Sequence, residues 1–379
     1  MSAPSAADLL ARLPIRDDLR GRSPYVAPQL DVPVRLGSNE NSYPVPDAVV
    51  EAIVEAVAAQ AAQLNRYPDR EFSALREDLA GYLSPAAGPA GITADQVWAG
   101  NGSNEVLQHV LLAFGGPGRT ALGFTPAYSM HPVLSAGSGT RWVDGRRGRG
   151  SDLFRLDPAD AAAQVTAHQP DVVFLCSPNN PTGTALHLDV VSAVYAAARG
   201  MVVVDEAYIE FARPGTPSAL TLLPGRQRLI VTRTMSKAFG FAGARLGYLA
   251  ADPAVCDAFR LVRLPYHLST LTQAAARAAL AHVGELLKTV EAIKTQRDRI
   301  VAELPRLGLT PVPSDANFVL FGGLGDEQAG WQRLLDHGVL IRDVGLPGHL
   351  RVTAGTPAET DAFLAALAAA VRPTRTEEI

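Results

Sequence analysis

Short apolar runs recur along the first two thirds of the chain, separated by helical patterns and by polar residues, glycine or proline. The clearest runs are Val172 to Cys176 and Met201 to Val204, which lack the alternation of a half-exposed strand. Unbroken apolar runs of this length are typical of parallel strands buried on both faces. The alternation with helices therefore predicts an α/β fold with a mostly parallel sheet. Strands are expected to end near Val97, Phe124, Cys176, Asp205, Arg233 and Leu249.

The last third of the chain has a different pattern, which predicts a second domain. An N-terminal arm with a small-domain segment is expected in residues 1–40, a large domain in 41–270 and a smaller α/β domain in 271–379. The polar tail Arg372 to Ile379 is expected to be loosely ordered. The elements expected in this third are an alanine-rich helix from about Thr272 to Leu304, strands around Phe318, Ile341 and Arg351, and a helix from Ala358 to Val371.

Composition excludes some classes of function. The formal net charge of −4 over 379 residues provides no basic field for nucleic acid, and the arginine-rich run Arg141 to Arg149 is expected to be a solvated loop. Two cysteines are too few for a disulfide framework. No stretch approaches the roughly 18 apolar residues that span a bilayer, and the N-terminus lacks a secretion signal. We therefore expect a soluble cytoplasmic protein.

The histidines do not predict a metal site. The chain has 8 of them, and none shows metal-ligand spacing. His131, His267 and His349 stand near the polar motifs described below, but no role is assigned to them because packed or solvated histidines are commoner than ligands.

A lysine just past a predicted strand carries the first chemical signal. Lys237 follows Ser236 directly and precedes Arg245 by eight residues. An amine in this position can hold an aldehyde cofactor as a Schiff base, while Ser236 and Arg245 bind the cofactor's phosphate. An ordinary surface lysine would explain the motif alone, so the interpretation depends on residues upstream.

Two other predicted strand ends carry polar groups that suit such a cofactor. Asp205 closes one apolar run, and Asn180 lies in the proline-rich loop that follows another. Ligands bind at the carboxyl ends of parallel strands. There Asp205 could keep the pyridine nitrogen of pyridoxal phosphate protonated, while Asn180 and Tyr208 reach its ring oxygen. Each residue also has a purely structural explanation. Asp205 could cap a helix or form a salt bridge, Asn180 could serve only the turn, and Tyr208 could be a packed aromatic ring.

A glycine-containing loop upstream is a candidate anion site. The segment Gly100 to Glu105 precedes the apolar run Val106 to Phe114, which has helical periodicity. Small residues there leave backbone N–H groups pointing at the helix N-terminus, where anions bind. The loop is a weak signal alone, but it could form the second half of a phosphate cup.

Taken in order, these motifs resemble the class I and II aminotransferases, which depend on pyridoxal phosphate and have the type I fold. The motifs are Asn180-Pro181-Thr182-Gly183, Asp205 with Tyr208, Ser236-Lys237, and Arg245. The resemblance implies a mostly parallel central sheet in a large domain and a smaller α/β domain. It also implies that Lys237 forms the Schiff base, that Asp205 partners the ring nitrogen, and that Asn180 and Tyr208 partner the ring oxygen. By the same resemblance, the cofactor contacts also include Ser103, Asn104, Ser236 and Arg245 at the phosphate and Tyr128 stacked on the ring.

Within that family the chain is more similar to the histidinol-phosphate aminotransferases, over nearly its whole length. After Asn41 many members have proline, whereas this chain has Ser42-Tyr43-Pro44, so the shape of that loop is left open. The resemblance implies a homodimer in which Tyr67 reaches the partner's cofactor phosphate; a tyrosine in a turn is the alternative. The supporting motifs are Ser23-Pro24-Tyr25, Leu36-Gly37-Ser38-Asn39-Glu40-Asn41, Arg66-Tyr67-Pro68-Asp69, Ser314-Asp315-Ala316-Asn317-Phe318, Ile341-Arg342-Asp343 and Leu350-Arg351-Val352-Thr353.

Substrate recognition is assigned to arginines. A guanidinium binds carboxylate or phosphate bidentately, which makes Arg351 the first candidate anchor and Arg342 the second. The resemblance adds Asn317 to the substrate site. Tyr25 could line the imidazole side of the pocket, or it could only pin the terminal segment.

The resemblance implies transamination of L-histidinol phosphate with 2-oxoglutarate, giving imidazole-acetol phosphate and L-glutamate in histidine biosynthesis. Lys237 would act as general base and acid. The same fold also admits an aromatic amino acid aminotransferase or a decarboxylase of a phosphorylated amino acid. A ligand sensor joined to a DNA-binding module is a further alternative, but no segment before Ser23 or after Val371 is long enough for that module.

Overall fold

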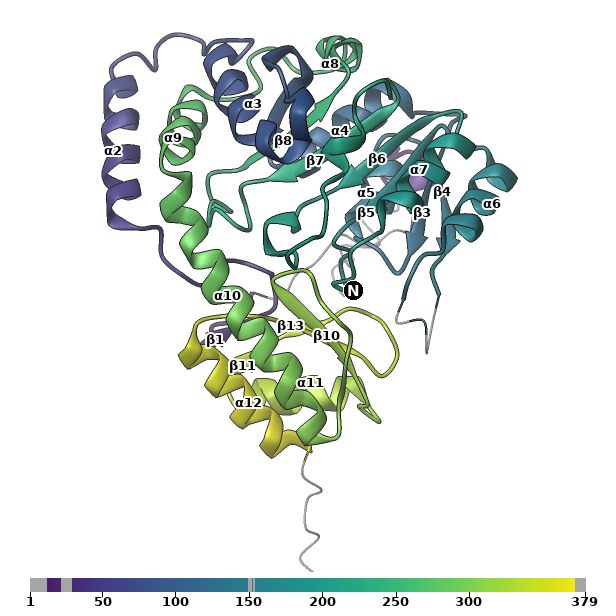
Figure 1. Ribbon diagram of the computed structural model, residues 1–379, viewed down its shortest axis with the longest axis vertical. Helices are drawn as coiled ribbons and strands as arrows, with labels where there is room; N and C mark the ends of the chain where they lie inside the picture. The colour runs from purple at the N-terminus through teal and green to yellow at the C-terminus, as the bar shows by residue number, and fades with distance from the viewer. Residues whose placement is uncertain (1–11, 22–28, 149–151, 153, 372–379) are drawn as a thin grey trace, which may run out of the picture.

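The computed structural model describes residues 12–21, 29–148, 152 and 154–371. Figure 1 shows an upper body that contains most of the helices and a lower body built around a smaller sheet. The predictions for Tyr25 and for the tail Arg372 to Ile379 lie outside the described residues.

The larger sheet has seven strands among the described residues, in the order β2-β8-β7-β6-β5-β3-β4. Strand β8 runs antiparallel to both of its neighbours, and the other pairings are parallel. Every residue of β5 and β6 is buried, as their unbroken apolar pattern predicts. The mostly parallel sheet confirms the predicted α/β class. The strands are β2 (Val97–Asn101), β3 (Thr120–Thr125), β4 (Arg141–Arg146), β5 (Val172–Cys176), β6 (Met201–Asp205), β7 (Leu229–Thr234) and β8 (Leu246–Ala251).

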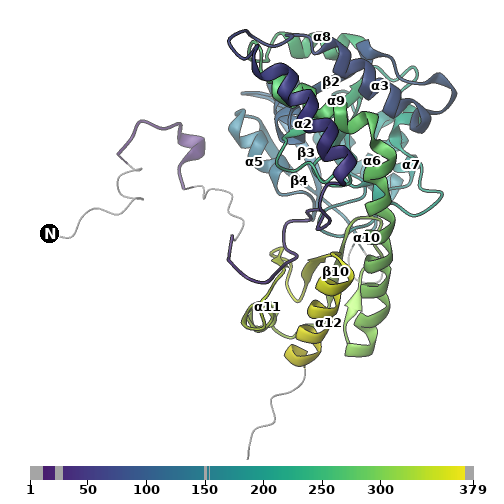
Figure 2. The same cartoon turned by 90° about the vertical axis from the view of Figure 1, so that its left-hand side faces the viewer.

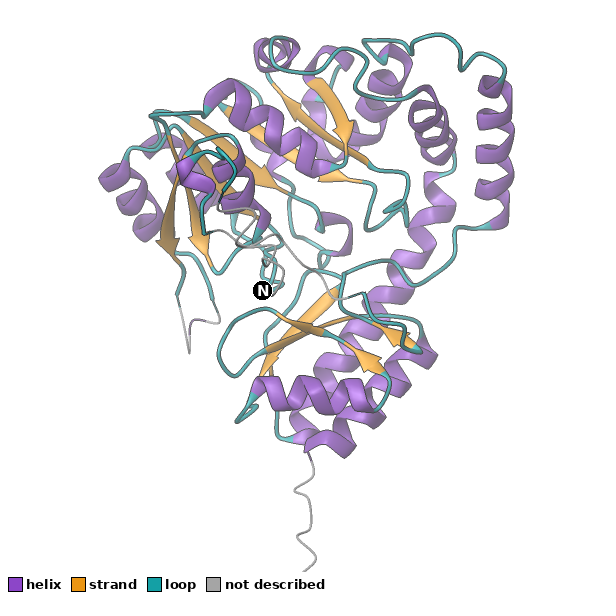
Figure 3. Ribbon diagram, turned by 180° about the vertical axis from the view of Figure 1, so that it is seen from behind, coloured by secondary structure: helices purple, strands orange, loops and turns teal. Residues whose placement is uncertain are grey.

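Helices lie in front of and behind this sheet (Figure 3). Helix α6 packs on α7, α4 packs on α5 and α8, and α2 lies beside α9 (Figures 1 and 2). The helices of the upper body are α2 (Asp47–Ala61), α3 (Ser73–Ala87), α4 (Ser103–Phe114), α5 (Met130–Gly137), α6 (Pro158–His168), α7 (Leu188–Ala197), α8 (Pro253–Arg260) and α9 (Thr270–Ala281). No helix in the described ranges combines the length and apolarity needed to cross a bilayer.

The lower body contains an antiparallel sheet with the order β12-β13-β10-β9. Strand β1 (Val34–Arg35) pairs with β11 in parallel, so this early segment joins the C-terminal elements. Helix α10 runs from the upper body down into the lower one (Figure 1). The division at residues 40 and 270 stays a prediction. The remaining elements are α10 (Val283–Glu303), β9 (Thr310–Pro311), β10 (Phe318–Gly322), α11 (Glu327–Asp336), β11 (Val339–Leu340), β12 (Arg342–Asp343), β13 (Leu350–Thr353) and α12 (Pro357–Val371).

Three expectations about elements are wrong. Strand β2 begins at Val97 instead of ending there. The alanine-rich helix is broken at His282, whose φ of −115° and ψ of 25° lie outside the helical region. The prediction missed this break because a single non-helical residue does not change the hydrophobic pattern. The run expected as a solvated loop forms edge strand β4 over Arg141–Arg146, followed by the buried Arg147. Edge strands have one paired side and tolerate exposed charges, so their pattern resembles that of a loop.

Candidate active site

Two adjoining cavities lie at the carboxyl ends of the central strands. The first has a volume of about 380 Å³ and the second about 450 Å³. Ser38, Tyr128, Tyr208 and Lys237 line both of them. The first cavity is also lined by Glu40, Ser103, Asn104, Cys176, Asp205, Ala207, Thr234, Ser236, Ala242, Gly243 and Arg245. The second is also lined by Gly37, Asn39, Ala127, Ser129, Asn180, Pro181, Arg342, Asp343, Val344 and Arg351.

Lys237 follows strand β7 and lies where the two cavities meet. Its Nζ donates to the carbonyl oxygen of Ser38 at 3.0 Å. Burial and the positive charges of Arg351 and Arg245, opposed by Glu40, together lower the pKa of the Lys237 amine to about 8. An amine that is partly neutral near physiological pH can act as a nucleophile and as a base.

Asp205 ends strand β6 at the edge of the first cavity and is 1% exposed. Its Oδ2 lies 3.2 Å from Nε2 of His131, and its Oδ1 accepts a hydrogen bond from the Thr232 hydroxyl at 3.3 Å. The His131 ring stacks on Phe174 with centroids 4.7 Å apart. A buried carboxylate is stable only with such partners, and here they also fix its orientation.

Tyr208, which lines both cavities, contacts Asn180, which lines the second. The Asn180 side-chain amide donates to the Tyr208 hydroxyl at 3.5 Å, and Nη1 of Arg351 donates to Oδ1 of Asn180 at 2.5 Å. The second Arg351 nitrogen, Nη2, donates to the Gly37 carbonyl at 2.9 Å. Burial raises the pKa of Tyr208 to about 12, although Arg351 and the hydrogen bond from Asn39 oppose it. The phenol is therefore protonated at neutral pH.

The part of the first cavity around Ser103 and Arg245 suits an anion. Helix α4 begins at Ser103 without a side-chain cap, so the backbone N–H groups at its start can bind an anion. Gly102 precedes it with φ of +83°, and a Cβ there would come within 2.6 Å of Nη2 of Arg245. Glycine thus lets the guanidinium lie against the start of the helix. Ser236 and Thr234, whose hydroxyls are 3.0 Å apart, line the same cavity.

This donor set fits pyridoxal phosphate. The helix start and Arg245 match a phosphate, the buried Asp205 carboxylate matches a ring nitrogen, and the Tyr208 phenol matches a ring oxygen. Lys237 supplies an amine on the wall that the two cavities share. Tyr128 lies beside Asn104, to whose Oδ1 it donates at 3.3 Å, and its ring packs edge-on against His131. The cavity therefore joins most of the residues that the sequence indicated.

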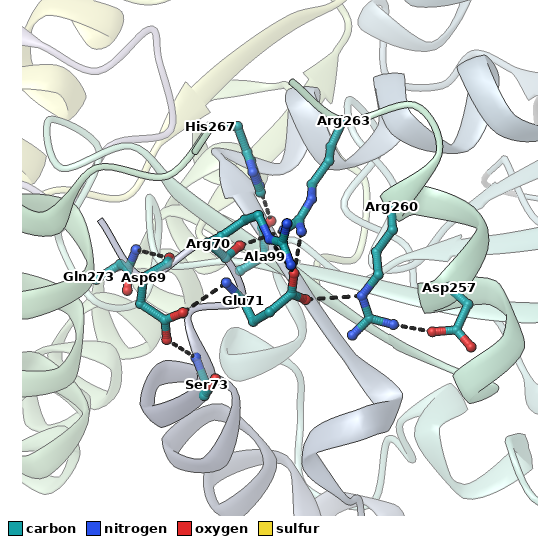
Figure 4. Close-up of polar contacts among 10 residues, drawn as sticks. All are labelled: Asp69, Arg70, Glu71, Ser73, Ala99, Asp257, Arg260, Arg263, His267 and Gln273. Carbon is teal, nitrogen blue, oxygen red and sulfur yellow. Dashed lines mark hydrogen bonds and ion pairs between the residues drawn. The ribbon is translucent and has the colours of Figure 1, made fainter. Parts of the chain in front are cut away.

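Two predicted residues lie elsewhere. Tyr67 is 79% exposed and stacks on Tyr266, with ring centroids 4.4 Å apart. Glu71 holds the same loop through Arg260 at 3.0 Å and Arg263 at 2.5 Å (Figure 4).

Asn317 lies behind the cavities instead of lining them. It is fully buried, and its side-chain amide donates to the Asn39 carbonyl at 3.1 Å.

Sequence reasoning missed several residues of the site. His131 was left without a role, although it follows Tyr128 by only three residues and its backbone N–H donates to the Tyr128 carbonyl at 3.1 Å. Thr234 and Glu40 line the first cavity, and Asn39 lines the second. Asn39 and Glu40 belong to the motif Leu36 to Asn41, but no role at the site was assigned to them or to Thr234, because their positions depend on segments that meet only in the folded chain.

Comparisons with known proteins agree with this geometry. The aminotransferase class I and II family model matches residues 32–367. The chain is 63% identical to a histidinol-phosphate aminotransferase of Frankia casuarinae, over 94% of this chain and 89% of that one. It is 64% identical to that of Paenarthrobacter aurescens, over 95% of each chain.

A solved structure supports the same family. The histidinol-phosphate aminotransferase of Sinorhizobium meliloti in complex with pyridoxal-5'-phosphate superimposes with a TM-score of 0.79, at 29% identity, over 90% of this chain and 91% of that one. The family model, the relatives and the solved structure all indicate the same family over most of the chain. The chain belongs to the class I and II aminotransferase family, whose members are pyridoxal-phosphate-dependent enzymes.

Proposed function

We propose that this enzyme transfers the amino group of L-histidinol phosphate to 2-oxoglutarate, as a step of L-histidine biosynthesis. Relatives that carry the name histidinol-phosphate aminotransferase are 63% and 64% identical over at least 94% of this chain. The single observation that carries the proposal is the shared wall of the cavities, where Lys237 lies between an anion cradle and a second cavity with two arginines.

Lys237 is the proposed covalent anchor and proton carrier. Pyridoxal phosphate, when bound, supplies an aldehyde that takes up the amino group and a ring that withdraws electrons. With cofactor and substrate bound, the Lys237 amine would take a proton from the substrate carbon and deliver it to the carbon of the cofactor's aldehyde group. Its pKa of about 8 suits both directions of this transfer near neutral pH.

The other residues of the first cavity are proposed to bind and orient the cofactor. Asp205, held by His131 and Thr232, keeps the ring nitrogen protonated. Tyr208 and Asn180 are assigned to the ring oxygen. The remaining proposed contacts are Ser103, Asn104, Ser236 and Arg245 at the phosphate and Tyr128 against the ring.

Arg351 and Arg342 are the proposed anchors of the substrate's anionic group. They lie opposite each other on the paired strands β12 and β13, and both line the second cavity. Histidinol phosphate carries a phosphate, whereas 2-oxoglutarate carries two carboxylates, so the same guanidinium groups must accept both kinds of anion. Asn317 would then act on this site through Asn39, to which it donates.

A cytoplasmic homodimer is part of the proposal. Tyr67 lies away from the cavities of its own chain and stacks on Tyr266, and Leu261 and Leu264, in the segment just before Tyr266, are exposed. An exposed cluster of large apolar side chains is typical of a surface that binds another protein. In the homodimer, Tyr67 would contact the cofactor phosphate of the partner subunit.

The test is a single half-reaction. The protein loaded with pyridoxal phosphate is mixed separately with histidinol phosphate and with phenylalanine, and the absorbance of the bound cofactor is followed. Fast conversion with histidinol phosphate and slow conversion with phenylalanine is the expected result. The reverse order would make the protein an aromatic amino acid aminotransferase, and the absence of conversion with either amine would contradict the proposed activity.

A further inference from the structure

Asn39 occupies an unusual position beside the site. It lies in the segment between β1 and α2, is 1% exposed, and has a left-handed backbone with φ of 54°. Asparagine adopts this conformation more readily than most residues, but it remains uncommon outside glycine. A buried, left-handed polar residue at the wall of a cavity indicates that its side chain must take one particular direction.

The hydrogen bonds of Asn39 connect the lower body to Tyr208. Its side-chain Nδ2 donates to the Tyr208 hydroxyl at 3.0 Å. Its backbone N–H donates to Oγ1 of Thr353 at 3.0 Å, and the same Thr353 hydroxyl donates to Oδ1 of Asn39 at 3.2 Å. Asn317 binds the Asn39 carbonyl, so every polar group of the residue except one amide hydrogen has a defined partner.

These partners fix which end of the Asn39 amide faces the phenol. Because the Thr353 oxygen accepts from the Asn39 backbone, its own proton is directed at Oδ1 of Asn39. The Asn39 oxygen is thereby occupied, which leaves the Nδ2 donor towards Tyr208.

The Asn180 amide is oriented in a similar way. Arginine has no acceptor, so the Asn180 oxygen faces Arg351 and the Asn180 nitrogen faces Tyr208 at 3.5 Å. Two N–H donors therefore converge on the phenol oxygen. A hydroxyl that accepts from two donors must direct its own hydrogen away from both of them.

Tyr208 lines both cavities, whereas Asn39 and Asn180 line the second and not the first. The direction away from both donors is therefore towards the first cavity. We propose that Asn39 is a positioning residue that directs the Tyr208 O–H hydrogen into the first cavity, so that Tyr208 donates to the cofactor's ring oxygen. This inference rests on the proposed function for the assignment of Tyr208 to that oxygen.

Strand β13 orients both amides. Arg351 and Thr353 are two residues apart on this strand, so their side chains lie on the same face. Arg351 holds the Asn180 amide and Thr353 holds the Asn39 amide. The strand that carries the proposed substrate anchor therefore also sets the direction of the hydrogen bond to the cofactor.

The experiment titrates the absorbance of the bound cofactor with pH, without substrate, in four variants and the parent. Tyr208→Phe removes the donor and defines the full effect. Asn39→Gly removes the amide but keeps the left-handed backbone at no steric cost. Thr353→Val removes the orienting hydroxyl, and Thr353→Ser is the matched control that retains it.

The expected shifts follow from the direction of the hydrogen bond. A donor to the ring oxygen stabilises its deprotonated form, so loss of the donor raises the titration midpoint. Asn39→Gly should raise it by about 0.5 to 1 pH unit, in the same direction as Tyr208→Phe. Thr353→Val should give part of this rise, and Thr353→Ser none.

The other groups around the phenol and the amine stay the same in the Asn39 and Thr353 variants, so the comparison isolates the amide. The charged or titratable groups near Tyr208 or Lys237 are Arg351, Asp205, Cys176, Glu40 and Arg245.

Two results would overturn the inference. A parental midpoint in Asn39→Gly, together with a raised midpoint in Tyr208→Phe, would mean that Tyr208 is directed without Asn39. An unshifted midpoint in Tyr208→Phe would remove Tyr208 from the ring oxygen altogether. Either result is independent of the half-reaction that tests histidinol phosphate. If Asn39→Gly does not load cofactor, the pair Thr353→Val and Thr353→Ser decides the question.

Discussion

The two cavities that meet at Lys237 are built in different ways. The first is formed largely at strand ends of one buried sheet, so strand pairing fixes the position of Asp205 and the β7 strand end. The second is assembled from segments far apart in the sequence, including Gly37 to Asn39, Asn180, and Arg342 with Arg351. A cavity built on one sheet is rigid, whereas one built between two bodies depends on how those bodies pack. The first suits a resident cofactor and the second suits substrates that enter and leave.

The largest effect is expected at the shared wall. Lys237→Ala should lower kcat by at least about 10²-fold, because the proton carrier at the substrate carbon is lost. Steady-state turnover measures this, and absorbance after gel filtration reports whether cofactor is retained. Lys288→Ala, at an exposed lysine on α10, is the control and should leave turnover unchanged. Full activity in Lys237→Ala would contradict the mechanism.

The second cavity should respond to loss of its anchor. Arg351→Ala should lower kcat/KM about 10- to 100-fold for histidinol phosphate and for 2-oxoglutarate, because a charge-assisted hydrogen bond to each anion is lost. Arg306→Ala, at an exposed arginine, is the control. A loss confined to 2-oxoglutarate would mean that the two substrates use different anchors.

A pH profile would sharpen the contrast between the buried amine and an ordinary lysine. Only the neutral amine reacts with an aldehyde, and the pKa of Lys237 is lowered to about 8. The rate at which the cofactor-free protein takes up pyridoxal phosphate should therefore rise with pH with a midpoint near 8. A midpoint near the usual lysine value of about 10.4 would show that the amine is solvated.

The smallest effect is expected at the loop that carries Tyr67, outside both cavities. Burial would raise the pKa of Glu71, but hydrogen bonds from Arg260 and Arg263 outweigh it and lower the pKa to about 2. A lowered carboxyl pKa stabilises the fold above the unfolded value, near 4.5, and this contribution is lost as the pH falls towards 2.

Glu71→Gln should accordingly lower the free energy of unfolding by no more than about 1 kcal/mol at pH 7, since the group is partly exposed. Urea unfolding at pH 7 and pH 3 measures the difference, which should shrink at the lower pH. Asp78→Asn, in an exposed pair with Arg277, is the control and should change less. A difference that stays constant with pH would assign the effect to packing instead of charge.

Local sequence patterns were sufficient to predict the strands at the first cavity and most of its motif residues. The apolar runs of β5 and β6 predicted buried strands, and the order of the motifs around Asn180, Asp205, Lys237 and Arg245 predicted the chemistry. The buried strands are confirmed, and Asp205, Lys237 and Arg245 line one cavity, because the apolar residues of a strand and the polar residue at its end are adjacent in the sequence. The chemical roles of these residues stay predictions. The helix break at His282 and the edge strand β4 were missed, because the order of apolar and polar residues depends little on the backbone angles of one residue or on whether a strand lies at the edge of a sheet.

The sequence by itself determined the class of fold, the family and most of the residues around the first cavity. Only the tertiary structure decided that His131 holds Asp205, that Asn39 and Thr353 act on Tyr208, and that Asn317 lies behind Asn39. Thr353 is 314 residues from Asn39 along the chain. Hydrogen bonds over such separations form when the two bodies pack, so no local pattern of residues encodes them.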